Sequence, residues 1–136
     1  MTAMALRFRP LATVTALLFF ALSAILMFLP AVVLANWGVG FNESIGLVCR
    51  RSAALYAGVG LMLFLARKAE PPPARSALVS GFVFACVIPA GLGAFELASG
   101  RVNSGILPAI LVEVALAIAY LLVARAERSN ATQPKL

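Results

Sequence analysis

Four long apolar runs decide what this chain can fold into. The runs extend over residues 11–35, 45–66, 77–98 and 105–124. Each is close to the length of about 20 mainly apolar residues that a helix needs to cross a membrane. The loops between the runs are short, so no linker separates domains. We therefore expect a single all-α membrane domain over residues 1–136, built as a bundle of four transmembrane helices.

The composition excludes a soluble fold. Hydrophobic residues make up 62% of the chain and charged residues only 12%, whereas about 25% of a typical soluble domain is charged. A water-soluble domain of 136 residues cannot bury so much apolar surface. The net charge is +6, but the basic residues stand at the ends of the apolar runs, where they set topology and contact lipid head groups. We therefore expect membrane lipid around the chain, and no nucleic-acid partner.

The positions of Lys and Arg predict the orientation of the bundle. Eight of these residues fall in the N-terminal segment, in the loop between the second and third runs, and in the polar tail, while three fall on the other side. Because cytoplasmic segments are rich in Lys and Arg, both termini are predicted to be cytoplasmic. The eight are Arg7, Arg9, Arg67, Lys68, Arg75, Arg125, Arg128 and Lys135, and the three are Arg50, Arg51 and Arg101.

The first run has an alternative interpretation as a signal peptide that is cleaved after Ala35. Val33 and Ala35 fit the small-residue rule at such a cleavage site. However, the apolar stretch over residues 11–29 has 19 residues, and the apolar core of a signal peptide usually has about 7–15. We expect the run to be retained as the first membrane helix, and the sequence leaves cleavage open.

The residue types exclude most catalytic sites. The chain has no His and no Asp, so it lacks the commonest general base and metal ligand, and neither a Ser-His-Asp site nor a carboxylate–His di-iron site can form. Cys49 and Cys86 are predicted at different depths, so we expect packing roles and no disulfide. We predict that the chain is not an enzyme and holds no cofactor or metal. The acidic residues are Glu43, Glu70, Glu96, Glu113 and Glu127.

Charged residues at membrane depth mark a candidate site. Glu113 follows Gly105 by eight residues, about 12 Å below the outer end of the fourth helix. Arg51 lies about 9 Å below the same surface if the second helix begins near Ile45. A charge at such depth needs a partner or water. Arg50 and Arg51 differ by about 100° around a helix, so they cannot face the same neighbour. We predict that Arg51 pairs with Glu113 inside the bundle.

Glu96 is a rival partner at the outer end of the third run. In one interpretation it is an interfacial residue beside Arg101. In the other, Glu96 and Glu113 line a small polar pocket that opens to the outside, which Tyr56, Asn103 and Trp37 could join. The candidate site residues are therefore Arg50, Arg51, Tyr56, Glu96 and Glu113, either as a ligand-binding site or as an intramembrane charge pair.

Small residues and aromatic residues predict the packing and the interfaces of the bundle. Small residues let helix backbones approach in lipid, and aromatic rings anchor helices at the membrane interfaces. Trp37 and Tyr120 are interpreted as such anchors. The predicted packing positions are Ala53, Ala57 and Gly60 in the second run, and Gly81, Ala85, Pro89 and Gly93 in the third.

Two segments carry a family resemblance. They are CRRSAALYAGVGLMLFLAR at the head of the second run and PAILVEVALAIAY in the fourth, and a proline-containing break separates the two halves of the chain. This pattern resembles the DoxX-like group of small bacterial four-helix membrane proteins, and it looks closest to an uncharacterised branch. The resemblance implies a multi-pass protein of the bacterial cytoplasmic (inner) membrane. Some members of the wider group are linked to sulfur-compound or quinone redox complexes.

Two functions from different classes follow as hypotheses. The first is a non-catalytic accessory or assembly module of a larger membrane complex or homo-oligomer, because the chain is small and lacks catalytic residue types. The second is an outward-facing site for a small lipid, a quinone or an anionic ligand. In that site Arg50 or Arg51 contacts the ligand, and Glu113 orients the arginine. The sequence does not identify the ligand, the partner or the oligomeric state.

Overall fold

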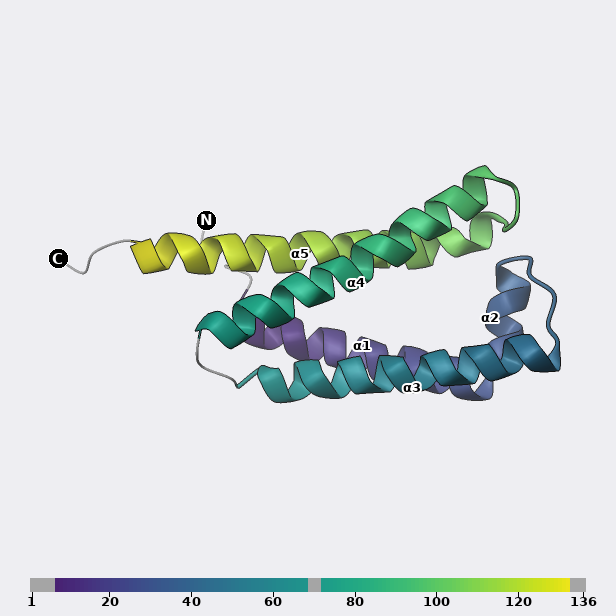
Figure 1. Cartoon of the computed structure of the whole chain (residues 1–136), viewed down its shortest axis with the longest axis horizontal. Coiled ribbons are helices and arrows are strands. Elements are labelled where there is room, and N and C mark those ends of the chain that lie inside the picture. The colour runs from purple at the N-terminus through teal and green to yellow at the C-terminus, as the bar shows by residue number, and fades with distance from the viewer. Residues whose placement is uncertain (1–6, 69–71, 133–136) are drawn as a thin grey trace.

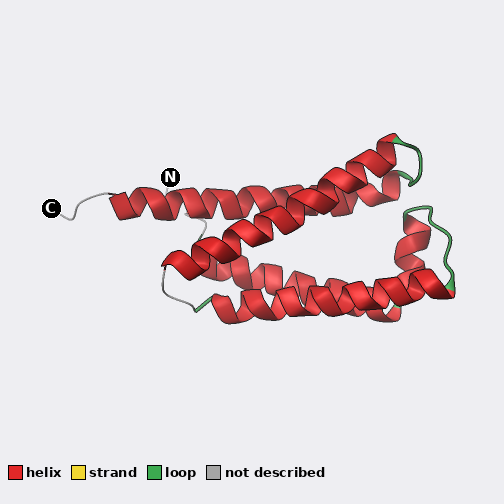
Figure 2. Cartoon of the chain, in the orientation of Figure 1, coloured by secondary structure: helices red, strands yellow, loops and turns green. Residues whose placement is uncertain are grey.

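The computed structural model describes residues 7–68 and 72–132, and this part of the chain contains helices and loops but no strand (Figure 2). Four of the helices are long and apolar enough to cross a membrane, which confirms the predicted all-α, four-helix membrane fold. The helices are α1 (Phe8–Phe28), α2 (Pro30–Asn36), α3 (Glu43–Ala66), α4 (Pro72–Ala98), the 3₁₀ helix η1 (Ser104–Ile106) and α5 (Leu107–Thr132).

The long helices form two antiparallel pairs, α1 with α3 and α4 with α5 (Figure 1). The start of α1 and the end of α5 lie at the same end of the bundle, which we call the terminal end. The short helix α2 lies at the opposite end, beside the turn between α4 and η1. Each pair therefore comes from one half of the chain. At the terminal end, α1 and α4 begin and α3 and α5 end.

The prediction of one continuous helix over residues 11–35 is wrong. Pro30 lacks a backbone N–H and clashes with the carbonyl four residues earlier, so it interrupts a helix. Leu29, between α1 and α2, has φ −129° and ψ 41°, outside the helical region. Pro30 then occupies the first turn of α2, where a missing N–H costs nothing. The remaining α1 still has 21 residues and is long enough to span.

Other helix boundaries also differ from the prediction. Asn42 caps α3, since its side-chain oxygen accepts a hydrogen bond of 2.9 Å from the Ile45 N–H; the helix starts at Glu43 and not at residue 45. The third run was predicted from residue 77, but α4 begins at Pro72 because proline is tolerated in a first helical turn. The fourth run was predicted to end at residue 124, but α5 continues to Thr132.

The largest group of buried side chains gathers near the terminal end, where all four long helices contribute. Tyr120 is 0% exposed, and its ring lies 4.7 Å from Phe82 and 6.2 Å from Phe8 between ring centroids. The interpretation of Tyr120 as an interfacial anchor is therefore wrong, because its ring fills the space between the converging helices. The core residues are Phe8, Ala12, Ala16, Leu63, Val79, Phe82, Cys86, Ala117, Tyr120 and Val123.

Small residues hold α1 against α3. Gly60 is buried, and a Cβ atom at this position would lie 3.2 Å from the Ala16 carbonyl oxygen. Farther along the pair, the Ser23 hydroxyl donates a hydrogen bond of 2.7 Å to the Ala53 carbonyl. The small-residue prediction is confirmed for Ala53 and Gly60, since both are buried in this contact.

The small-residue stripe on α4 is only partly a packing surface. Gly93 packs against Ile110 of α5, whose Cγ1 atom would lie 3.0 Å from an added Cβ. Gly81 and Ala85 are exposed, and an added Cβ at Gly81 meets no atom within 4 Å. The prediction is therefore wrong for Gly81 and Ala85, because α4 turns that side to the outside of the bundle.

Gly60→Val should destabilise the bundle by about 1–3 kcal/mol, because the added side chain has no room beside α1. Gly58→Val is the matched control, since a Cβ at Gly58 meets nothing within 4 Å. Both changes carry the same β-branched penalty in the same helix. Unfolding of the purified protein in micelles measures the difference, and equal stability of the two variants would contradict the packing of α1 on α3.

The charge bias predicts that the terminal end faces the cytoplasm. A reporter that is active only in the cytoplasm should be active when it is fused after Leu136. The same reporter inserted between Ser99 and Gly100, in the exposed turn after α4, should be inactive. The opposite pattern in the two fusions would invert the predicted topology.

Candidate functional site

The predicted ion pair between Arg51 and Glu113 does not form. Arg50 and Arg51 are both exposed on α3. Within residues 7–68 and 72–132, ion pairs join Arg75 to Glu127 and Arg101 to Glu96, and neither arginine of α3 is in one. The physical reason is that α3, which packs mainly on α1, turns Arg50 and Arg51 outward. The long side chains of Arg50 and Arg51 can instead extend to the lipid head groups.

Glu96 lies at the end of α4 and is held by its own turn. The Arg101 guanidinium donates to both carboxylate oxygens of Glu96, and one of these bonds, from Nη2 to Oε1, measures 3.1 Å. The hydrogen bond from Arg101 to Glu96 raises the pKa of Arg101 above its ordinary value. Arg101 also lies over the ring of Phe95, with 5.1 Å from Cζ to the ring centroid. The structure therefore places Glu96 beside Arg101, as the interfacial interpretation predicts.

Glu113 has polar neighbours on two other helices. Its carboxylate is close enough to interact electrostatically with the Tyr56 hydroxyl of α3 and with the Cys86 thiol of α4. The Tyr56 ring packs on Phe19 of α1 at 5.3 Å between ring centroids, which holds it on the inner side of the α1–α3 pair. Tyr56 and Glu113 thus come into one neighbourhood, whereas Glu96, the other carboxyl of the predicted pocket, is held by Arg101.

Cys86 completes this group, which we call the Tyr56–Cys86–Glu113 cluster. Sequence reasoning interpreted Cys86 as a packing residue, and it does belong to the buried core. Its position near mid-membrane, close to the depth of Glu113, was the signal that could have linked the two residues. Cys49 of α3 and Cys86 are both free thiols.

Glu113 itself is only partly buried. In the part of the chain that the structure describes, its carboxylate makes no hydrogen bond and no ion pair. The cluster can donate and accept hydrogen bonds through a carboxyl, a phenol and a thiol. It contains no imidazole, because the chain has no His.

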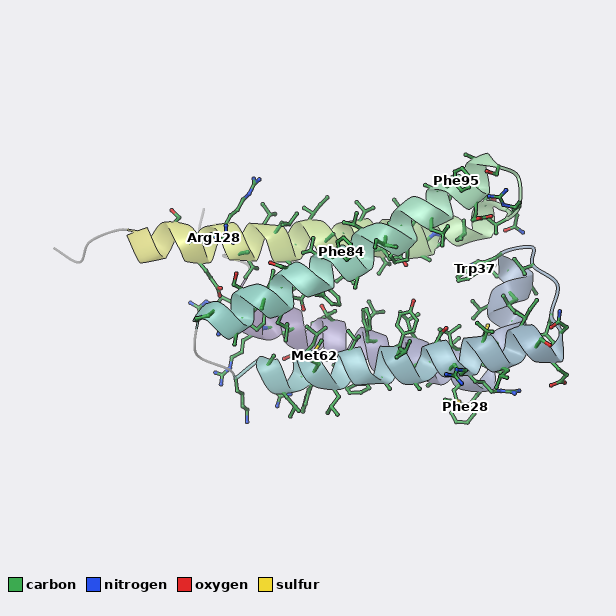
Figure 3. All side chains as sticks on the ribbon, viewed as in Figure 1. Phe28, Trp37, Met62, Phe84, Phe95 and Arg128 are labelled. Carbon is green, nitrogen blue, oxygen red and sulfur yellow. The ribbon has the colours of Figure 1, made fainter. Side chains whose placement is uncertain are left out.

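At the opposite end, α2 joins the two helix pairs. The Asn103 N–H donates a bond of 2.9 Å to the Trp37 carbonyl, and the Asn36 amide donates one of 3.2 Å to the Gly105 carbonyl. Gly105 admits no side chain, since a Cβ there would lie 1.9 Å from the Asn36 carbonyl oxygen. Trp37 is partly buried and projects from the end of α2 toward the α4–α5 pair (Figure 3). These contacts tie α2 to the turn before α5, at the end of the bundle opposite the terminal end.

Arg51→Ala and Glu113→Gln should act independently on stability, because no ion pair connects the two residues. The coupling free energy from a double-mutant cycle is expected to stay within about 0.5 kcal/mol, the usual limit for separate sites. Unfolding of the wild type, both single variants and the double variant in micelles provides the cycle. A coupling well above about 1 kcal/mol would show that the pair forms in the membrane.

Comparison with known proteins finds no family model, no curated protein and no solved structure that matches this chain.

Proposed function

We propose that this chain is a non-catalytic accessory or assembly module of a membrane complex. The observation that carries this proposal is the Glu113 carboxyl, which stands within an apolar helix, is only partly covered by its own chain, and has no hydrogen bond or ion pair among the described residues. A carboxyl in that state at membrane depth is costly. A helix of a partner, or of a second copy, that carries a hydrogen-bond donor would remove this cost.

The exposed faces of the bundle suit such an association. Helices in lipid gain little from burying apolar surface, so polar side chains and close backbone contacts hold them together. Every long helix of this chain exposes large apolar side chains, and Glu113 is the carboxyl available among them. Examples of the exposed apolar side chains are Leu17, Leu55, Phe84, Leu92, Leu111 and Ile118.

Catalysis by this chain alone has little support. An acid–base mechanism would have to run on Glu113, Tyr56 and Cys86, without a histidine and without a cation in the cluster. The arginines that the ligand hypothesis required stand exposed on α3 and not beside Glu113. The proposal therefore remains a non-enzymatic one.

The Tyr56–Cys86–Glu113 cluster favours a second candidate function, the binding of a small ligand. The Glu113 carboxyl lies within electrostatic range of the Tyr56 phenol and the Cys86 thiol, which come from two other helices, and binding sites use a small number of such polar groups. A carboxylate without a cation beside it disfavours an anionic ligand, so a neutral ligand such as a quinone or a neutral lipid fits better. In this case a small molecule retained by the wild type should be lost from Tyr56→Phe.

The location proposed with this function is the bacterial cytoplasmic (inner) membrane, with both termini in the cytoplasm. The DoxX-like resemblance and the bias of Lys and Arg support that location.

Glu113→Gln should weaken assembly about three- to tenfold, as expected for the loss of one polar contact between membrane helices. After gentle extraction, the wild type should migrate in an assembly larger than its own 14.2 kDa chain, and the variant should shift toward the single chain. Glu43→Gln is the control, since Glu43 is exposed in the first turn of α3. A wild type that is monomeric in the extract, or a variant that assembles normally, would contradict the proposal.

A further inference from the structure

A cavity of about 370 Å³ lies between α4 and α5, in the half of the bundle near the terminal end. It does not include Glu113 or its neighbours, and it lies at the other end of the bundle from Arg50 and Arg51. Its lining residues are Ser76, Val79, Ser80, Val83, Phe84, Val87, Leu121, Ala124, Arg125 and Arg128. We call this site the α4–α5 groove.

The groove is polar at one end and apolar along the rest of its length. Because α4 and α5 are antiparallel, Ser76 and Ser80 near the start of α4 stand level with Arg125 and Arg128 near the end of α5. Toward the middle of the membrane the lining becomes apolar. Figure 3 shows this polarity, with Arg128 near the terminal end of α5 and Phe84 farther along α4. This change from a polar to an apolar lining matches the change from head group to acyl chain in one leaflet of a bilayer.

The polar end carries positive charge. Glu127 is the acid of this last stretch of α5, and its carboxylate accepts a bond of 2.7 Å from Arg75 of α4. The terminal segments and the loop between the two halves of the chain together hold eight Lys and Arg residues against two acids, Glu70 and Glu127, so this end of the bundle is cationic. Arg125 is exposed, and no ion pair engages it within the residues that the structure describes.

We propose that the α4–α5 groove binds an anionic phospholipid from the leaflet at the terminal end. The phosphate lies at Arg125 and Arg128, whose guanidinium groups match phosphate oxygens geometrically. The hydroxyls of Ser76 and Ser80 are placed to hydrogen-bond the glycerol and ester oxygens. One acyl chain follows the apolar lining past Phe84.

Selectivity in this site comes from the head group. An acyl chain gains little on moving from bulk lipid into an apolar groove, because both surroundings are apolar. Juxtamembrane arginines attract anionic head groups, whereas a zwitterionic head group brings its own cation and cancels that attraction. The expected ligand class is therefore a phospholipid with net negative charge. This inference is independent of the assembly role proposed for Glu113.

Lipid titration followed by native mass spectrometry tests the proposal. The full chain, freed of lipid in detergent, is titrated with dioleoyl phosphatidylglycerol and separately with dioleoyl phosphatidylcholine. The wild type should bind the first phosphatidylglycerol at least about fivefold more tightly. The double variant Arg125→Gln and Arg128→Gln should lose this preference. The matched double variant Arg50→Gln and Arg51→Gln removes the same charge from the opposite end of the bundle. This variant should keep the preference for phosphatidylglycerol.

Val87→Trp tests the apolar part of the groove without a change in charge. Val87 is 53% exposed, so the larger side chain can enter the groove without displacing the core, and it should weaken phosphatidylglycerol binding. A wild type without preference for the anionic lipid would overturn the proposal whatever the variants do. An equal loss of the lipid preference in both double variants would show that only the overall charge of the protein matters, and it would contradict a specific site in the groove. Displacement of the lipid by soluble glycerol 3-phosphate would show a phosphate site without a lipid groove.

Discussion

The convergence of the four long helices around Tyr120 is the contact on which the rest of the structure depends. Side chains from both helix pairs meet there, including Phe8 of α1, Leu63 of α3 and Phe82 of α4. Toward the opposite end the buried contacts lie mainly within each pair, as with Ser23 on Ala53 and Gly93 on Ile110. The core thus holds the two helix pairs together near the terminal end. The contacts of α2 hold them together at the opposite end. Both the Glu113 neighbourhood and the α4–α5 groove take their positions from this arrangement.

Much of the fold could be predicted because membrane spans depend on local composition. An apolar run of sufficient length has few alternatives to a helix in lipid, so four runs gave four spanning helices. Hydropathy alone does not reveal the break at Pro30. The break follows from the chemistry of proline, which lacks a backbone N–H and clashes with the carbonyl four residues earlier. The start of α4 and the end of α5 differ from the prediction because segments with polar residues, such as Arg75 and Arg125, can extend a helix beyond the hydrocarbon.

The candidate site was predicted less well. The depth of a residue along a helix can be counted from the sequence, but the sequence does not show which helices pack against each other. Glu96 and Arg101 are five residues apart, and this local pair follows from the sequence. The pairing of Arg51 with Glu113 assumed that the second and fourth spans face each other with these residues inward, whereas α3 packs mainly on α1. Tyr56 and Glu113 interact electrostatically. Cys86 of a third helix also interacts with Glu113, and the sequence does not show that these helices are neighbours.

The pairing of consecutive helices also bears on the order in which the chain is made. All the residues of the α1–α3 pair precede Arg67, and those of the α4–α5 pair follow residue 71. The first hairpin can therefore close while the second is still on the ribosome, and it can offer Phe8 and Leu63 as a finished surface. The later hairpin supplies Phe82 and Tyr120 to that surface. The chain order therefore allows the bundle to form by the docking of two hairpins in sequence, with α2 joining the second pair once Gly105 has emerged.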